Sequence, residues 1–136
     1  MDYELSEKYR PSEAALEFTR EKISQGDIGV IVPPGGGQIP VLYARGKGLA
    51  EAWENAMFAV WTHGALVGTQ YDKPGDPPSK DCTMTMVVED PCAEPFIHRS
   101  FPGGLEDLEE YRQEVVDGIK NHWIRDPENP EDTRWE

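Results

Sequence analysis

Six apolar residues recur at helical spacing between positions 49 and 60, and this periodicity constrains the fold more than any other feature of the chain. They are Leu49, Ala52, Trp53, Ala56, Met57 and Val60. The spacing predicts an amphipathic helix that begins near Leu49, buries this stripe and ends at Gly64. Trp53 and Trp61 could form a base-stacking pair, but core packing is the favoured interpretation for aromatic residues in such a helix.

A repeat of two residues follows at positions 82–89. The apolar side of this repeat consists of Cys82, Met84, Met86 and Val88. Such alternation predicts a β-strand with one buried face. Shorter apolar runs predict strands at 28–32, 39–44 and 65–70. The intervening segment DKPGDPPSKD, residues 72–81, is rich in proline and charge and is predicted to be a surface loop.

Two further segments show helix signals. Ser12 precedes an apolar-periodic stretch that stops at Gly26, which predicts a helix over 12–25. Residues 105–119 carry a second apolar stripe behind an acidic first turn, and we expect this helix to pack on the sheet. Its apolar positions are Leu105, Leu108, Val115 and Ile119. The chain is therefore predicted to be α+β, with a mixed or mostly antiparallel sheet and about three helices.

The 136 residues suffice for one domain of ordinary size, so a single domain over 1–136 is expected. Within it we expect an N-terminal helix and strand extension at 1–38, a central region at 39–125 and an acidic, flexible tail at 126–136. The 13 glycines and 12 prolines predict short elements and many turns, including an exposed loop at 33–37.

The net charge of −13 argues against DNA or RNA as a partner, because nucleic-acid surfaces concentrate Lys and Arg. The sequence has no apolar run of membrane-spanning length, and its first residues lack the pattern of a signal peptide. A cytoplasmic protein without a membrane partner is expected. Cys82 and Cys92 are the only cysteines, and their spacing predicts free thiols.

Ser79 and Lys80, followed by Asp81, form the most suggestive candidate site. A hydroxyl and a cation at the end of a loop can bind a phosphate group together with backbone N–H groups. The structural alternative is a solvated turn in which Lys80 pairs with Asp81 or Asp76.

Other constellations favour structural interpretations. Arg45-Gly46-Lys47-Gly48 precedes a helix and could attract an anion, but helix-start glycines are the simpler interpretation. The glycines at 35–37 lack the lysine of a phosphate-binding loop. Cys92 lies near a histidine and an arginine without an implied third group for catalysis. The histidines match no metal-ligand spacing, so no metal site is expected; they are His63, His98 and His122.

Three segments together carry a family resemblance: LAEAWENAMFAVWTHG, PSKDCTMTMVVEDPCAEPFIH and FPGGLEDLEEYRQEVVDGIKNHWI. They resemble the N-terminal half of archaeal-type thymidylate synthase-like proteins, within the thymidylate synthase and pyrimidine-nucleotide hydroxymethylase family. The resemblance covers residues 39–135. It implies that Lys80, with Ser79, binds the nucleotide phosphate, and that the strand from Cys82 enters a sheet through which a homodimer forms.

The resemblance also implies a substrate and a co-substrate. These are a pyrimidine nucleoside monophosphate, dUMP or dCMP, and methylenetetrahydrofolate as donor for methyl or hydroxymethyl transfer, with no covalently bound cofactor. The family's nucleophilic cysteine lies in a later Pro-Cys motif, which Cys92 does not match in context. We therefore expect the N-terminal portion of such an enzyme, inactive alone and without a catalytic residue. The alternative is a noncatalytic binding domain of the same fold.

Overall fold

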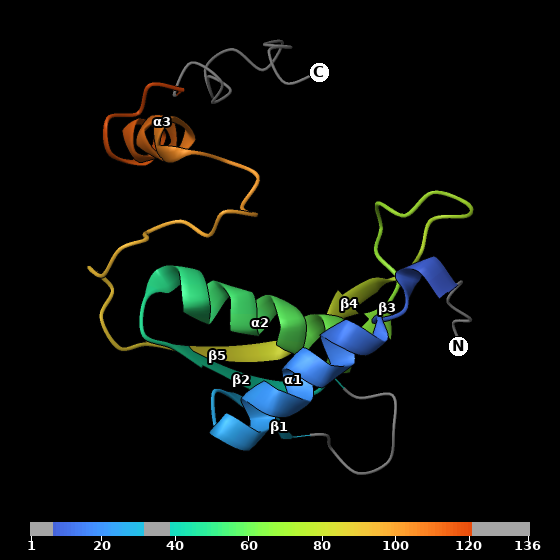
Figure 1. Cartoon of the computed structure of the whole chain (residues 1–136). Coiled ribbons are helices and arrows are strands. Elements are labelled where there is room, and N and C mark those ends of the chain that lie inside the picture. The colour runs from blue at the N-terminus through green and yellow to red at the C-terminus, as the bar shows by residue number, and fades with distance from the viewer. Residues whose placement is uncertain (1–6, 32–38, 121–136) are drawn as a thin grey trace. The chain divides into compact units, whose positions relative to one another are not determined.

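The computed structural model describes residues 7–31 and 39–120. Within these ranges the chain forms a 3-10 helix, three α-helices and five strands (Figure 1). The helices are η1 (Glu7–Tyr9), α1 (Glu13–Gln25), α2 (Leu49–His63) and α3 (Leu105–Val116). The strands are β1 (Ile28–Ile31), β2 (Val41–Gly46), β3 (Ala65–Val67), β4 (Ser79–Asp81) and β5 (Thr83–Val88).

The chain divides into two compact units, here called unit 1, which ends at His98, and unit 2, which begins at Arg99. The single domain expected over 1–136, with parts at 1–38, 39–125 and 126–136, stays a prediction. The predicted loop at 33–37, His122 and the tail at 126–136 lie outside the described residues.

Unit 1 contains a mixed sheet of three strands in the order β1-β2-β5. β1 pairs with β2 antiparallel, with Val30 opposite Leu42, and β2 pairs with β5 parallel, with Leu42 opposite Met84. The parallel pair requires a long crossover connection, which α2 supplies. The α+β class and the mixed sheet are confirmed.

A second, two-stranded sheet corrects two of the predicted boundaries. β4 lies inside the segment predicted to be a loop, and it pairs antiparallel with β3 so that Lys80 lies opposite Leu66. β3 ends at Val67 and does not reach residue 70. The reason is a turn in which the Asp72 carboxylate accepts hydrogen bonds from the backbone N–H and the hydroxyl of Thr69, both at 2.7 Å.

α1 has the ends that the sequence predicts. The Ser12 side chain accepts a hydrogen bond from the Ala15 backbone N–H at 3.2 Å, which caps the first turn. Gly26 follows the last turn with φ at 80°, a left-handed conformation that favours glycine. The helix at 12–25 is therefore confirmed.

α2 confirms the predicted helix and the burial of Ala52 and Ala56, but other members of the predicted stripe are not buried. Leu49 and Met57, both placed in the predicted stripe, are 40% and 48% exposed. The side that packs on the sheet carries small residues and one amide: Ala52, Asn55, Ala56 and Ala59. Small side chains let the helix approach the strands closely. The residues that pack on the sheet are therefore the small ones, although Leu49 and Met57 are more hydrophobic. Trp53 and Trp61 are half-buried at the helix flank.

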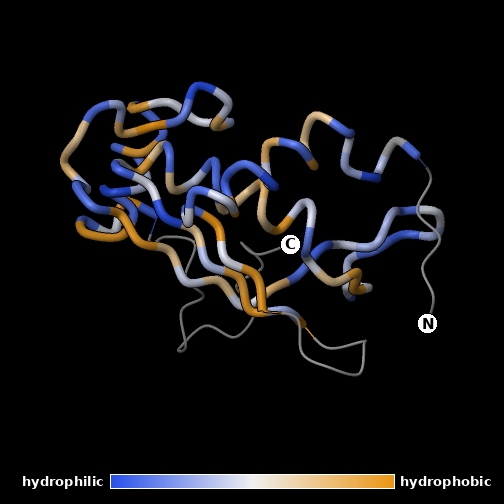
Figure 2. Tube along the Cα trace, turned by 60° about the horizontal axis from the view of Figure 1, so that its bottom comes forward, coloured by the Kyte–Doolittle hydropathy of each residue, from blue (hydrophilic) through white to orange (hydrophobic). Residues whose placement is uncertain are grey.

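The core of unit 1 lies between the sheet and α2. Ile28, Leu42 and Ala59 are its fully buried members, and the partly buried residues around them include Val60 and Met84. Figure 2 shows the hydrophobic colour running along the strands of the sheet. α1 packs beside α2 through a pair of rings, Phe18 and Phe58, with centroids 4.2 Å apart.

Unit 2 contains α3, which begins after Gly104 and has no buried residue. The Asp107 carboxylate accepts a hydrogen bond from the Gly104 backbone N–H at 2.6 Å, which closes the first turn. Ile119, expected within this helix, lies beyond its end at Val116. The packing of α3 on the sheet stays a prediction.

None of the helices in the described ranges combines the length and apolar character that crossing a membrane requires. A cytoplasmic location stays a prediction.

Candidate functional site

A pocket of about 310 Å³ lies in unit 1 beside the last turns of α2. Its walls come from η1, α2, β4 and the loop before β4, and they are predominantly apolar. The lining residues are Tyr9, Met57, Val60, Trp61, Pro77, Pro78, Ser79 and Lys80. The two residues predicted from the sequence to bind phosphate, Ser79 and Lys80, therefore share one pocket with two aromatic side chains.

Lys80 reaches the pocket because β4 runs close to the end of α2. A Cβ atom added to Gly64 would lie 3.2 Å from the Lys80 Cβ and 3.0 Å from a methyl group of Val60. The lack of a side chain at this position thus allows the strand to pass the helix end. The Lys80 ammonium donates a hydrogen bond to the Trp61 carbonyl and lies over the Trp61 ring, 4.5 Å from its centroid.

This position gives Lys80 a structural role beside any role in binding. The last carbonyl groups of a helix lack partners within the helix and carry partial negative charge, which a cation stabilises. Burial lowers the pKa of Lys80 below its ordinary value. An ammonium group has three donors, so a bond to Trp61 leaves donors for an anion. The alternative pairing with Asp81 or Asp76 is not what the structure contains.

His63 lies at the same end of α2. Its Nδ1 is 2.8 Å from the Thr62 hydroxyl oxygen. Burial lowers the pKa of His63, and the nearby charge of Lys80 lowers it further. The lowered pKa leaves His63 uncharged at neutral pH, so it adds no positive charge beside Lys80.

Ser79 is exposed. Asp81 forms its hydrogen bond with a residue other than Lys80. The Asp81 carboxylate accepts a hydrogen bond from the Cys82 backbone N–H at 2.8 Å. Sequence reasoning missed the other six residues of the pocket and favoured core packing for Trp61. The missed residues are Tyr9, Met57, Val60, Trp61, Pro77 and Pro78. Tyr9 belongs to a short 3-10 helix with no periodic signal, and only tertiary packing brings it to the end of α2.

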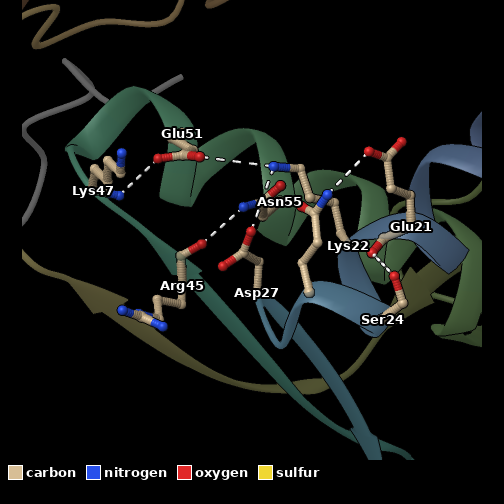
Figure 3. Close-up of polar contacts among 9 residues, drawn as sticks. Glu21, Lys22, Ser24, Asp27, Arg45, Lys47, Glu51 and Asn55 are labelled. Carbon is tan, nitrogen blue, oxygen red and sulfur yellow. Dashed lines mark hydrogen bonds and ion pairs between the residues drawn. The ribbon is translucent and has the colours of Figure 1, made fainter.

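The glycine-rich start of α2 does not form an open anion site. The Glu51 carboxylate accepts a hydrogen bond from the Lys47 backbone N–H at 2.8 Å, which already places negative charge at the positive end of the helix (Figure 3). Gly46 is required by packing, because an added Cβ would lie 2.7 Å from the Ala52 Cα. The helix-start interpretation of these glycines is supported.

Partly buried polar contacts hold the first half of α2 to α1 and the sheet. The Asn55 side-chain amide donates to the Arg45 carbonyl at 2.8 Å, and Lys22 lies 3.5 Å from an Asp27 carboxylate oxygen and 3.7 Å from one of Glu51 (Figure 3). The side-chain oxygen of Asn55, Oδ1, is buried without a hydrogen-bond partner among the described residues. Arg45 pairs with Glu89 across the sheet edge.

Cys92 and His98, considered together for catalysis, have separate polar contacts, and Cys92 is an exposed free cysteine. His98 places its Nε2 3.2 Å from a Glu54 carboxylate oxygen, and its ring lies on Trp53 with centroids 5.1 Å apart. The Cys92 backbone N–H donates to the Asp90 carboxylate at 3.0 Å. In the part of the chain that the structure describes, no three His, Cys, Asp or Glu side chains gather as metal ligands would.

Comparison with protein-family models, with curated proteins and with solved structures found no match for the chain.

Proposed function

We propose that unit 1 binds a pyrimidine nucleoside monophosphate in the pocket beside α2. The observation that carries this proposal is the presence of Lys80 and Ser79 in one pocket with Trp61 and Tyr9. A cation and a hydroxyl suit a phosphate group, and aromatic side chains suit a planar ring. The volume of about 310 Å³ lies at the small end of the range for ligand sites.

The proposal extends to the reaction class that the family resemblance implies. The chain would then be the N-terminal portion of a thymidylate synthase-like one-carbon transferase, which uses methylenetetrahydrofolate and acts in the cytoplasm. We place no catalytic residue in the described residues. The expected affinity is modest, because the negative end of the α2 dipole opposes a phosphate at Lys80.

Calorimetric titration with dUMP and dCMP tests the ligand. We expect the parent protein to bind with a dissociation constant of roughly 0.1–1 mM, and Lys80→Met to weaken binding about tenfold, the usual effect of losing a charge-assisted hydrogen bond. Methionine retains an aliphatic stem against Trp61, which limits damage to the fold. Lys73→Met, in the exposed loop before β4, is the matched control and should bind as the parent does. No heat of binding at millimolar nucleotide would remove the proposal.

A second candidate function is a noncatalytic interaction domain, favoured by the outer face of the three-stranded sheet. Ile31, Val41 and Val87 are 66%, 40% and 38% exposed there. Ile31 and Val41 lie opposite each other in neighbouring strands, while Val87 lies opposite Arg45. Exposed apolar residues that adjoin on a sheet are typical of protein interfaces. A homodimer through the sheet is the partner that the family resemblance implies, and we propose this face for it. Light scattering after gel filtration tests it: Val41→Lys should convert a dimer to a monomer, whereas a monomeric parent would exclude a homodimer.

A further inference from the structure

We propose that the open edge of β5 binds an extended segment of another protein, which adds as a further strand and carries basic residues at both ends. This surface is independent of the nucleotide pocket, because no residue of β5 lines that pocket. It also differs from the outer sheet face proposed for a homodimer, since the contact is made by the backbone of one strand.

The backbone of β5 carries hydrogen-bonding groups that the sheet does not use. β5 ends the strand order β1-β2-β5, so among the described residues only β2 pairs with it. The Thr83 backbone N–H donates to the Pro40 carbonyl at 2.9 Å, and the Glu89 backbone N–H donates to the Gly46 carbonyl at 3.1 Å. In a parallel pair every second residue bonds to the neighbouring strand, and the residues between them direct their N–H and C=O groups the other way. The residues that offer these groups to an added strand are Met84, Met86 and Val88.

The side chains of β5 do not guard this edge. Proteins usually protect an exposed edge strand with charged residues or proline, because a bare edge pairs with other chains. β5 has the sequence TMTMVV, which contains neither. Met84 packs against the core, so Met86 points to the same face of the sheet, yet Met86 is 46% exposed. An added strand would cover Met86 with an apolar side chain and would place polar side chains beside the exposed Thr85 on the other face.

The charges at the two ends of β5 indicate the chemistry of the partner. Asp81 precedes the strand and Asp90 follows it, and both are exposed. Each carboxylate accepts a hydrogen bond from a nearby backbone N–H and has further acceptor sites for a basic side chain. A second copy of this chain fits less well. An antiparallel pair centred on Met86 would bring Asp81 of one copy beside Asp90 of the other, and each copy carries a net charge of −13.

NMR titration of the full chain with a designed strand peptide tests the proposal. The probe is Lys-Thr-Val-Thr-Val-Thr-Lys with both ends capped, and the control peptide has glutamate in place of both lysines. We expect the lysine peptide to bind with a Kd of roughly 0.1–1 mM, and the glutamate peptide to bind about tenfold more weakly at low salt. With the lysine peptide at about ten times its Kd, hydrogen exchange at the outward-facing amides of β5 should slow about tenfold.

Two variants separate the edge from the rest of the sheet. Met86→Pro removes an N–H at the open edge and no bond to β2, so it should abolish peptide binding while the amide signals of β2 report an intact sheet. Val41→Lys, on the outer face, should bind the peptide as the parent does. N-methylated probes test the same bonds without changing the protein. Methylation of one alternate set of peptide amides should abolish binding, and methylation of the other set should not.

Slow exchange of the outward-facing amides in the free monomer would show that the edge is already paired, and would overturn the proposal. Protection that rises with protein concentration would assign the edge to a second copy instead. Equal affinity for the lysine and glutamate peptides would contradict a basic partner, and unchanged β5 signals with either peptide would exclude an added strand. None of these results bears on nucleotide binding, which is measured separately.

Discussion

In unit 1 one face of the sheet buries Ile28, Leu42 and Ala44, whereas in unit 2 no residue of α3 is buried. Leu42 of β2 is wholly inaccessible, while Leu105 of α3 is 68% exposed. Ion pairs run along α3 instead, including Arg112 with Glu109 at 2.8 Å and Lys120 with Glu110 at 3.0 Å. Unit 1 is therefore stabilised by burial, whereas the contacts within α3 are local and exposed.

The largest expected effect tests the buried side of this comparison. Leu42→Ala should lower the free energy of unfolding of unit 1 by about 3 kcal/mol, because it removes apolar contacts and leaves a cavity. Leu108→Ala in α3, at a position 41% exposed, is the matched control and should change stability by less than about 0.5 kcal/mol. Urea unfolding followed by the amide NMR signals of β2 measures the first change, and the amide signals of α3 measure the second. Equal effects would remove the distinction between the units.

Gly46→Ala probes how closely α2 approaches the sheet. The new methyl group would meet the backbone of Ala52, and we expect a loss of about 2–3 kcal/mol in the free energy of unfolding. Gly48→Ala is the control two residues further on, where the nearest atom to an added Cβ is 3.6 Å away. It should cost less than about 1 kcal/mol. A Gly46→Ala variant as stable as the parent would contradict the close packing.

Ser12→Ala tests the end of a helix in the packed unit. Loss of the cap leaves a backbone N–H of the first turn without its acceptor, so thermal unfolding should show a loss of about 1 kcal/mol. Ser24→Ala, which removes an exposed hydroxyl bond to the Glu21 carbonyl at the other end of α1, should cost less than about 0.5 kcal/mol. The reverse order would mean that the cap contributes little.

The smallest effect concerns pH and the ion pairs of α3. Hydrogen bonds from Arg112 and then Gln113 lower the pKa of Glu109 to about 2. Because the folded pKa is depressed, the stabilisation is complete above the ordinary value near 4.5 and is lost as pH falls towards 2. Titration of the Glu109 carboxyl carbon by NMR should give a midpoint well below 4, and Arg112→Gln should return it towards 4.5. An unshifted midpoint in the parent would exclude the pair.

Much of the fold of unit 1 could be predicted from local signals. The cap at Ser12, the glycine at 26 and the strand character of β5 each depend on neighbours in sequence, and each is confirmed. The buried face predicted for β5 is only partly covered, because Met86 is 46% exposed. β4 was missed because it is a strand only through its pairing with β3. The proline-rich sequence around it gives no local signal for such pairing. The buried side of α2 was predicted correctly at Ala52 and Ala56 and misjudged at Leu49 and Met57. Hydrophobic periodicity alone did not reveal that Asn55 and Ala59 are buried in their place.

The candidate site could be predicted only in its polar half. Ser79 and Lys80 were found because their chemistry and their place after a loop suggest phosphate binding. Lys80 contacts Trp61 because β3 follows α2 directly and β4 pairs with β3. This pairing brings β4 back to the end of the helix. Tyr9 lies far away in sequence, so its place in the pocket follows from tertiary packing.

The most direct test of the central claim is an amide and indole NMR titration of the full chain with dUMP. We expect chemical-shift changes at Tyr9, at the Trp61 indole N–H and at Lys80 that saturate together at millimolar nucleotide. The signals of α3 should not change. The absence of shifts at these three residues, or shifts centred on Arg45 to Gly48 at the start of α2, would contradict it.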